Sequence, residues 1–430
     1  MKKQLISAIA VSAVMLSSCH DDNKIVPFSY PDMAEAANPA VLFTTAAGVN
    51  VYNGGFGSAI AADPTQKDVF YLLTDRGSNV AGQTANSIII GKPDFDPQIG
   101  KFRLKDGKLI LEQTIELKNA TGQKLNGLPN PVGMGASGEV PFDLAGNQLA
   151  ASADGIDSEG LVLDGNGGFW VSDEYGPHIV HFDAAGKTIE RINPYGIGTG
   201  GRKIPAVFAT RRANRGMEGL AITPDGKTLV GMMQSPMYNP SKAAVSNSTI
   251  LRILTFDIAS GNTKQYAYVM NDKSLTGVSD ITVVNATTFL TVERDGNFGG
   301  AASNPATFKK VFKIDISNAT DISASDMSAV NGKLYNGKTV EELNDAAGLQ
   351  AAGITPVTKT EVLDLLKDLP TGIYPHDKAE GLTLLPGNIL AISNDDDFGV
   401  IDDGKNGFAA KILPLTNSVD HNRIYFVKLK

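Results

Sequence analysis

Residues 157–177 read DSEGLVLDGNGGFWVSDEYGP, and this stretch decides the fold. Two short apolar runs flank a turn of aspartate, glycine and asparagine at residues 164–168. Apolar, β-branched and aromatic residues on both sides of such a turn predict a β-hairpin. The open ends of an antiparallel pair lie side by side, so we expect Glu159 to share one edge of the sheet with Asp173 and Glu174.

The same pattern returns four more times along the chain. Each copy starts at an acidic or small polar residue, passes through an apolar hairpin and ends in polar or charged residues. Self-similar hairpins spread over a whole chain indicate a repeat architecture. The other copies occupy residues 57–77, 217–236, 278–296 and 379–399, and their first polar residues are Ser58, Glu218, Asp280 and Glu380.

Further apolar strands follow the hairpins. After the copy at 57–77, residues 101–104 and 109–113 predict a second hairpin, which completes a set of four strands. Four-stranded units repeated around an axis form a β-propeller, and closure of the ring removes exposed strand edges. We therefore predict an all-β propeller with five clear blade repeats and a sixth blade, closed by pairing of a strand at 41–44 with one at 424–429.

Two long stretches separate the repeats and have room for insertions or for the sixth blade. Residues 118–156 are rich in glycine, asparagine and proline and predict a long loop. Residues 317–376 predict a small, partly helical insertion, with helices at 339–347 and 358–368. The second of these segments fits an outer strand equally well.

The composition is that of a folded soluble protein. The 430 residues are 42% hydrophobic and 20% charged. The formal net charge of -8 argues against nucleic acid as a partner, because phosphate backbones recruit basic surfaces. It is compatible with metal cations held by carboxylates. The chain lacks a nucleophile elbow, a zinc-protease helix motif and a Walker-type loop.

The N-terminus predicts export. Two lysines precede an apolar stretch at residues 5–16, which is too short to span a bilayer as a mature helix. Residues 16–19, LSSC, resemble a bacterial lipoprotein box, which implies a signal peptide at 1–18, a lipid on Cys19 and a tether at 19–38. The protein would then be anchored to the outer membrane, facing the periplasm or the cell surface. A plain secretory signal is the alternative.

The polar ends of the repeats carry the candidate chemistry. Repeated positions of a propeller lie on a circle, so the carboxylates should face one another around the channel mouth. Crowded carboxylates raise one another's pKa unless a cation or a donor is present, and oxygen ligands from several strands suit Ca²⁺. The candidate metal ligands are Asp173, Glu174, Glu218, Asp280, Glu293 and Asp395. Arg76, Arg215 and Arg294 lie next to acidic positions and can pair with them or hold an anionic substrate.

A structural role is the alternative for these acids. A glutamate at the start of a propeller strand can accept backbone N–H groups from the next blade, and an aspartate can cap the turn that follows. The runs at 173–174, 293–295 and 395–397 carry more charge than capping requires, which favours a functional mouth. His178 and His376 lie beside prolines and are more simply interpreted as loop histidines than as bases.

These motifs resemble the phytase-like, or "esterase-like activity of phytase", domain family. The matching segments, in chain order, are residues 157–161, 169–177, 214–220, 224–226, 291–295, 378–382 and 394–398. The resemblance covers most of residues 50–430, within an expected domain at 39–430. It implies a β-propeller, often secreted, whose many acidic residues suggest hydrolysis of phosphomonoesters or phosphodiesters.

Two functions remain as hypotheses. The first is Ca²⁺-dependent hydrolysis of a small anionic phosphate ester by a monomer that touches the membrane only through its lipid. A metal would polarise the phosphoryl oxygen and activate water, and arginines would neutralise transition-state charge. The catalytic candidates are Glu159, Asp173, Glu174, Arg215, Glu218, Glu293, Arg294 and Glu380. The second hypothesis is a non-catalytic binding propeller for a glycan, peptide or protein partner.

Overall fold

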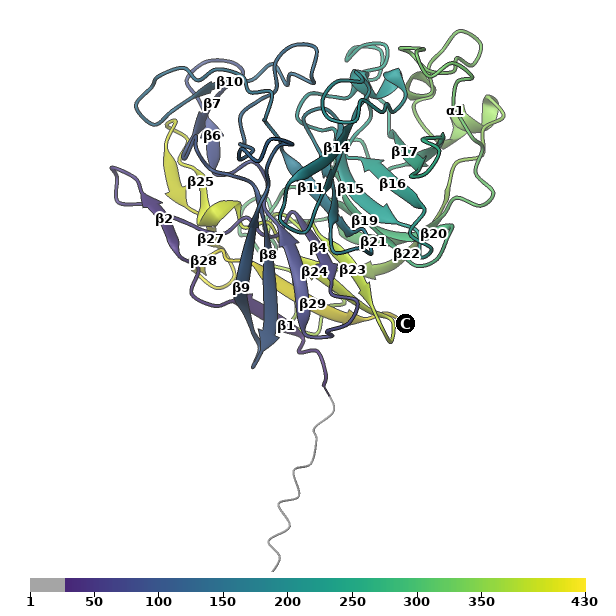
Figure 1. Ribbon diagram of the computed structural model, residues 1–430. Helices are drawn as coiled ribbons and strands as arrows, with labels where there is room; N and C mark the ends of the chain where they lie inside the picture. Colours follow the sequence, from purple (N-terminus) through teal and green to yellow (C-terminus); the bar gives the residue numbers. More distant parts are fainter. Residues whose placement is uncertain (1–27) are drawn as a thin grey trace, which may run out of the picture. The chain divides into compact units, whose positions relative to one another are not determined.

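β-Strands make up almost all of the regular structure in the computed structural model, which describes residues 28–430 (Figure 1). Residues 31–430 form one compact unit. The expected signal peptide at 1–18 and Cys19 lie outside the described residues. Within the described part of the chain, no helix has the length and apolar character needed to cross a membrane.

Five four-stranded blades surround the axis: three are separate sheets, and the first and fifth are joined into one eight-stranded sheet by pairing of β1 with β9. The first is β4 (Ala59–Ala62), β5 (Val69–Leu73), β8 (Gln98–Lys105) and β9 (Lys108–Glu116). The second is β11 (Ser158–Leu163), β12 (Phe169–Asp173), β13 (His178–Phe182) and β14 (Thr188–Ile192). The third is β15 (Met217–Ile222), β16 (Thr228–Met233), β17 (Ile250–Asp257) and β18 (Thr263–Val269). The fourth is β19 (Gly277–Val283), β20 (Thr288–Arg294), β21 (Lys309–Asp315) and β22 (Thr358–Asp364). The fifth is β23 (Leu382–Leu385), β24 (Ile389–Ser393), β29 (Arg423–Lys428) and β1 (Met33–Ala36).

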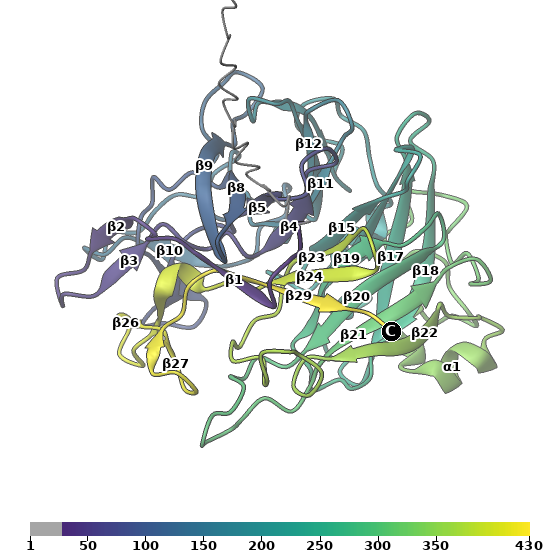
Figure 2. The ribbon, with the colours of Figure 1, turned by 90° about the horizontal axis from the view of Figure 1, so that it is seen from below.

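The innermost strands of these blades surround a common axis. Strands β4, β11, β15, β19 and β23 contact one another in that order, and β23 contacts β4 again. Figure 2 shows these five strands gathered near the centre, with β9, β18 and β22 farther out. The predicted β-propeller with five repeats is therefore confirmed, and each blade places the start of its inner strand near the axis.

The hydrophobic core lies between the blades. Trp170 on β12 of the second blade packs in one cluster with Leu220 and Leu254 of the third blade. Phe289 on β20 of the fourth blade packs in another cluster with Val230 of the third blade. Because each of these sheets is covered on both faces, their strands are apolar along most of their length rather than strictly alternating.

The ring is closed by β1, which pairs antiparallel with β29 and parallel with β9. We predicted closure by residues 41–44, but these form β2 (Val41–Thr44), which pairs with β3 (Asn50–Tyr52). The closing strand thus lies within the segment expected to be a tether, residues 19–38. Its sequence, MAEA, has no β-branched or aromatic residue, so its strand conformation depends on its two neighbours.

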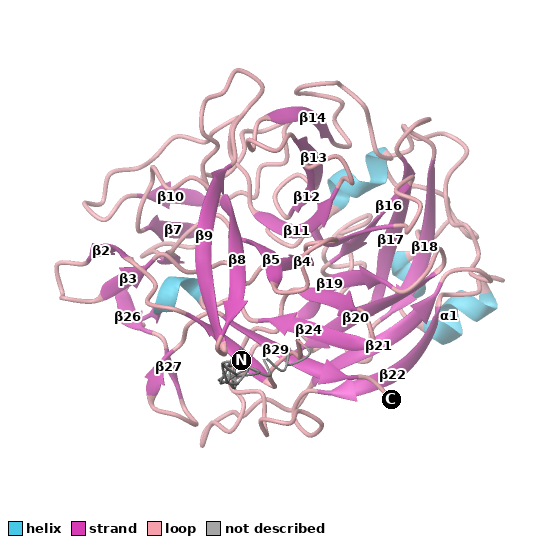
Figure 3. Ribbon diagram, turned by 60° about the horizontal axis from the view of Figure 1, so that its bottom comes forward, coloured by secondary structure: helices cyan, strands magenta, loops and turns pink. Residues whose placement is uncertain are grey.

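The long stretches between repeats hold small elements, and the described residues form no sixth four-stranded sheet. The loop expected at 118–156 contributes β10 (Val140–Phe142) to a three-stranded sheet with β7 (Ser87–Ile90) and β6 (Asn79–Ala81). The second helical candidate is the strand β22, the alternative that its pattern left open. The first becomes η2 (Glu341–Leu343) and α1 (Ala346–Ala351), at the edge of the molecule (Figure 3).

The remaining elements are short and lie in the connections between blade strands. They are η1 (Ala206–Thr210), η3 (Asp397–Gly399), β25 (Val400–Asp402), β26 (Phe408–Ala410), β27 (Ile412–Leu413) and β28 (Ser418–Val419).

A β-bulge at the start of three inner strands determines which residue is presented there. The register shifts between Ser158 and Gly160 in β11, and at the equivalent points of β15 and β19. Each shift leaves one extra residue without a partner across the ladder. These residues are Glu159, Glu218 and Ser279.

The glycine after the bulge lets neighbouring blades approach closely. A Cβ atom on Gly160 would lie 2.6 Å from the amide nitrogen of Leu220, and one on Gly219 would lie 2.6 Å from that of Ile281. By this packing Asp280 occupies the glycine position and Ser279 the glutamate position. The alignment of Asp280 with Glu159, made from the sequence, was therefore wrong by one residue.

Candidate functional site

Three glutamates from three different blades meet at the channel. Glu159 and Glu218 lie in the bulges of β11 and β15, and Glu380 lies two residues before β23. One carboxylate oxygen from each lies within 4.8 Å of the others. A second group, with the same spacing, consists of Asp157, Glu159 and Glu174. The structure thus brings together carboxylates that lie far apart in the sequence, from Glu159 to Glu380.

Burial and mutual repulsion make these carboxyls hard to ionise. Burial, followed by the charge of Glu380, raises the pKa of Glu218 to about 8. The pKa values of Glu159 and Glu174 are also raised well above the usual range, first by burial and then by the charge of Glu218. At neutral pH the site therefore retains protons that a cation would displace.

Two carboxylate oxygens in this site have no donor. Gln234 Nε2 donates to Glu218 Oε1 at 2.8 Å, and the Arg294 guanidinium donates to Glu380 Oε1. The other oxygens, Glu218 Oε2 and Glu380 Oε2, are buried without a hydrogen-bond partner. Glu174 is close enough to Glu218 for the two carboxyls to share a hydrogen bond, but only when one of them is protonated. Buried acceptors of this kind are costly unless a ligand satisfies them.

The three arginines predicted from the sequence differ in the hydrogen bonds that their guanidinium groups make. Arg76 is fully engaged, donating to Glu139 at 2.9 Å and to Asn214 at 3.1 Å. Arg294 also donates through Nε to Ser279 Oγ at 2.9 Å. Arg215 donates to the backbone carbonyl of Thr276. Burial lowers the pKa of Arg215, and the nearby Glu174 and Glu218 partly oppose this effect.

Asp173 does not belong to the channel, although Glu174 beside it does. Its Oδ1 accepts the backbone N–H groups of Asp157 at 2.9 Å and Tyr175 at 3.0 Å. Its Oδ2 lies 2.6 Å from His178 Nδ1, and both side chains are fully buried. Asp173 therefore stabilises the end of β12, and its assignment as a metal ligand and catalytic residue was wrong.

Glu293 is also directed away from the channel, because successive side chains of a strand point to opposite faces and Arg294 takes the channel side. The Glu293 carboxylate accepts from the Tyr268 hydroxyl and from Lys359, and its Oε2 accepts the N–H of Asn271 at 3.1 Å. All of its acceptor capacity serves contacts between β18, β20 and β22. Its assignment to the site was wrong as well.

Asp280 links two blades instead of holding a ligand. Its Oδ1 accepts the N–H of Ile281 at 2.7 Å, and its Oδ2 accepts the N–H of Leu382 at 2.7 Å. Both oxygens thus serve the backbone, which is the structural role weighed above as the alternative. Its assignment as a metal ligand was wrong.

Asp395 belongs to a separate buried network. Its Oδ2 accepts from Lys378 Nζ at 2.6 Å, and its Oδ1 accepts the N–H of Asp397 at 2.8 Å. Asp397 in turn accepts from Lys411 at 2.6 Å. Burial, and then the charge of Asp397, raises the pKa of Asp395 to about 7. Because lysines already neutralise these acids, the assignment of Asp395 to the metal site was also wrong.

The structure adds residues that the sequence pattern did not identify. Asp157 joins the acidic group from the first position of its repeat, where the other copies have no acid. Ser279 was passed over for its acidic neighbour. His376 lies in a loop as predicted, whereas His178 begins β13, and both side chains are fully buried. His376 contacts Asp420 at 2.7 Å and the Tyr425 hydroxyl at 2.9 Å, so it holds the fifth blade together.

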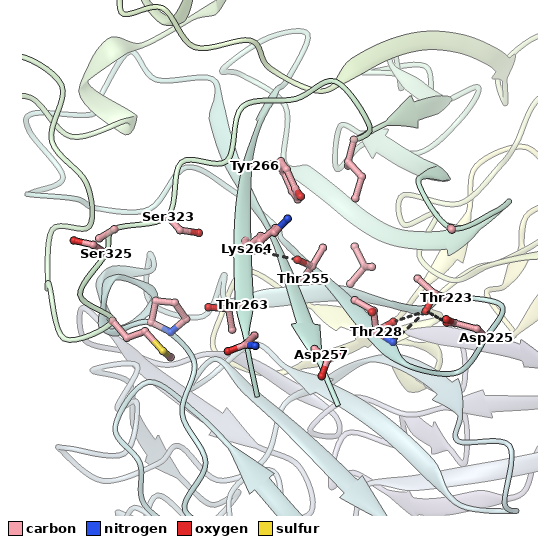
Figure 4. Close-up of a pocket in the computed structure, with 17 residues that line it drawn as sticks. Thr223, Asp225, Thr228, Thr255, Asp257, Thr263, Lys264, Tyr266, Ser323 and Ser325 are labelled. Carbon is pink, nitrogen blue, oxygen red and sulfur yellow. Dashed lines mark hydrogen bonds between the residues drawn. The ribbon is translucent and has the colours of Figure 1, made fainter. Parts of the chain in front are cut away.

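The largest cavity lies at the other end of the blades. It has a volume of about 690 Å³, and Figure 4 shows the hydroxyl groups and the single lysine, Lys264, in its lining. It is bounded by the turn at 223–228, which is opposite to the end of β15 that carries Glu218. Its two acids are already bonded, Asp225 to Thr223 Oγ1 at 2.7 Å and Asp257 to Ser260 Oγ at 2.6 Å. The acidic cluster and the largest cavity are therefore different places.

Comparison with known proteins adds a family match. A family model described as "Phytase-like: Esterase-like activity of phytase" matches residues 52–398. A relative from Arthroderma benhamiae, named "Uncharacterized secreted protein", is 26% identical over 378 residues, covering 72% of this chain and 71% of the relative.

Solved structures align with the chain only loosely. The GH43 endo-arabinanase from Bacillus licheniformis has a TM-score of 0.35 and 11% identity, covering 88% of this chain and 95% of that one. The periplasmic gluconolactonase of Pseudomonas aeruginosa has a TM-score of 0.33 and 9% identity, covering 89% of this chain and 91% of that one.

Proposed function

The chain belongs to the family described as "Phytase-like: Esterase-like activity of phytase", and from this premise we propose that it hydrolyses phosphate esters at a cation-binding channel mouth. The family description supports a hydrolase. The choice of phosphate esters, whether monoesters or diesters, and of calcium as the cation is our own.

One observation carries the proposal. The buried oxygens Glu218 Oε2 and Glu380 Oε2 have no donor, and both residues belong to the cluster that Glu159 completes. A group of hard oxygen acceptors without donors fits a divalent cation such as Ca²⁺, which takes carboxylate ligands at about 2.3 to 2.6 Å. The candidate ligands are therefore Glu159, Glu218 and Glu380, with Glu174 beside them.

The side chains of the mouth have distinct roles in this proposal. A bound calcium ion would polarise a phosphoryl oxygen and lower the pKa of a nearby water. Glu174, whose pKa is raised by burial and then by the charge of Glu218, is placed to give a proton to a leaving group. Arg215 supplies positive charge at the edge of the cluster, where an anionic substrate would otherwise be repelled. Gln234 and Arg294 hold Glu218 and Glu380 in place through the bonds described above.

The test is an assay of purified protein with a phosphomonoester, a phosphodiester and phytate, in calcium and in a chelator. We expect calcium-dependent turnover of at least one substrate. Replacing both Glu218 and Glu380 by Gln should remove it, whereas Glu361→Gln, an exposed carboxylate on β22, should not. Folded protein that turns over none of the three substrates would reject the proposal.

A non-catalytic binding propeller is the competing function. It predicts that every acid of the mouth is bonded to backbone or to a basic residue. Asp280, Glu293 and Asp395 meet that description, and Asp173 Oδ2 lies 2.6 Å from His178 Nδ1. Glu218 and Glu380 are each bonded through Oε1 only, and their Oε2 atoms have no hydrogen-bond partner. This difference favours the hydrolase.

We also propose that the protein is exported and carries a lipid on Cys19. The LSSC sequence supports this, as does the word "secreted" in the name of the Arthroderma benhamiae relative. Metabolic labelling with a tagged fatty acid should mark the wild type and not Cys19→Ala. Equal labelling of the two, or no labelling of either, would contradict the anchor.

A further inference from the structure

A second pocket lies beside the channel mouth, at the same end of the third blade as Glu218. Its volume is about 260 Å³. It is lined by Arg212, Ser235, Pro236, Tyr238, Lys242, Val245, Ser246, Ser248 and Lys273. The lining thus contains three cations, three serine hydroxyls and a tyrosine hydroxyl, and no carboxylate.

Among the described residues, the three cations of this pocket form no ion pair, and the acid whose pKa is lowered in part by one of them, Asp272 beside Lys273, is exposed. No carboxylate lies within ion-pair distance of Arg212, Lys242 or Lys273 in residues 28–430. The Arg212 guanidinium instead lies over the ring of Tyr238, 6.0 Å from its centroid. Lys273 Nζ donates to the side-chain oxygen of Asn247 at 2.6 Å, which fixes the ammonium group without cancelling its charge. In a protein of net charge -8, such a patch is an exception to the general acidity.

A buried hydroxyl in the lining also lacks a partner. Ser235 is 3% exposed, and its Oγ makes no hydrogen bond. Ser248 Oγ accepts the N–H of Ile250 at 3.2 Å, which leaves its own proton free to donate. A buried hydroxyl without a partner is costly, so both groups favour an acceptor-rich ligand in the pocket.

The pocket and the channel share one wall. Ser235 lines the pocket, and the preceding residue, Gln234, donates to Glu218 in the channel. Arg212 lines the pocket and forms a β-bridge with Arg215, whose charge lies near Glu174 and Glu218. The pocket and the acidic cluster are therefore close neighbours.

We propose that this pocket binds a tetrahedral oxyanion group of the phosphate or sulfate type. An oxyanion would accept hydrogen bonds from the serine hydroxyls and from Arg212, whose planar guanidinium matches two of its oxygens. If the function proposed above holds, the pocket takes a second anionic group of the substrate while the first reacts at the channel. The preferred substrate would then carry at least two such groups.

The experiment is calorimetric titration of the full chain with inorganic phosphate and with sulfate, in buffer containing a calcium chelator. We expect saturable binding of phosphate. Arg212→Ala and the double variant Lys242→Ala/Lys273→Ala should each weaken it about tenfold, the effect of losing a charge-assisted hydrogen bond. Lys405→Ala, a lysine in the turn between β25 and β26, is the matched control and should bind as the wild type does.

The double variant changes only exposed lysines, so the result does not depend on how well Arg212→Ala folds. Lack of saturable binding to the wild type, or binding that neither variant weakens, would overturn the inference. Failure of the proposed function is a separate outcome, since a protein without turnover can still bind phosphate here. The variant Glu218→Gln/Glu380→Gln should retain phosphate binding, and its loss would place the anion in the channel instead.

Discussion

At the level of single residues, three features of its surroundings determine the chemistry of Glu218. The bulge of β15 leaves it unpaired, Gln234 orients one of its oxygens, and burial followed by the charge of Glu380 raises its pKa. The sequence identified this glutamate because the Glu-Gly-Leu motif recurs. It did not separate Glu218 from Asp173, because both are acids at strand ends. Only the direction of the side chain distinguishes a free carboxylate from one bonded to backbone.

Calcium should stabilise the wild type through these free oxygens. A ligand that binds only the folded state raises stability with its concentration, by about 2.7 kcal/mol at one hundred times the dissociation constant. We expect Glu218→Gln or Glu380→Gln to abolish most of this stabilisation in thermal unfolding with calcium and with chelator. Glu361→Gln serves as the control. A calcium-induced shift of the same size in Glu218→Gln as in the wild type would contradict the assignment.

The buried Asp396 should make stability depend on pH. Burial, and then the charge of Asp420, raises its pKa from 3.8 to about 7. Since its folded pKa is raised, the folded state keeps a proton that the unfolded chain releases, so stability falls as pH rises from about 4 to about 7. The slope is at most about 1.4 kcal/mol per pH unit.

Asp396→Asn should remove this contribution while its Oδ1 still accepts from Gly55 and Phe398. Urea unfolding at several pH values between 4 and 8, with chelator present, measures the difference between the two proteins. The wild type should lose more stability than the variant across this range. Parallel curves would show that Asp396 does not titrate in this way.

At the level of elements, the alternation of side chains between the two faces of a strand determines which residues reach the site. Glu293 and Arg294 are neighbours on β20, yet one bonds to Tyr268 and Lys359 and the other reaches Glu380. The sequence predicted the hairpins of all five repeats because their apolar runs and turns are local signals. It could not assign Glu293 to a face, since a shift of one residue reverses every side chain and the bulges introduce such shifts.

Glu293→Gln therefore provides a test of the register. The change leaves Lys359 without its carboxylate and should cost about 1 to 3 kcal/mol of stability. Calcium affinity measured by calorimetry should stay within about twofold of the wild type, because Glu293 is directed away from the channel. A twofold change corresponds to about 0.4 kcal/mol of binding free energy. A loss of calcium binding as large as that of Glu218→Gln would mean that β20 is turned the other way.

Ring closure is a property of the whole molecule. The five repeats could be counted from the sequence, but the closing strand could not be identified, because MAEA has little strand character of its own. Its pairing with β29 and β9 supplies what the local sequence lacks. The sixth blade was expected from the length of the stretches between repeats, and length alone does not distinguish a blade from an insertion.

A chain that begins at residue 38 should reveal the contribution of β1. Without this strand β29 presents an unpaired edge, which invites association with other chains. We expect a melting temperature lower by about 5 °C or more and increased self-association, compared with a chain that begins at residue 28. Thermal unfolding and light scattering measure both effects. Identical behaviour of the two chains would contradict closure by β1.

The convergence of three blades on one cation is the central claim, and a crystal structure of the protein grown with calcium tests it most directly. The account predicts one strong anomalous peak in the channel, about 2.3 to 2.6 Å from oxygens of Glu159, Glu218 and Glu380. A channel without calcium, or calcium bound instead at Asp395 and Asp397, would contradict it.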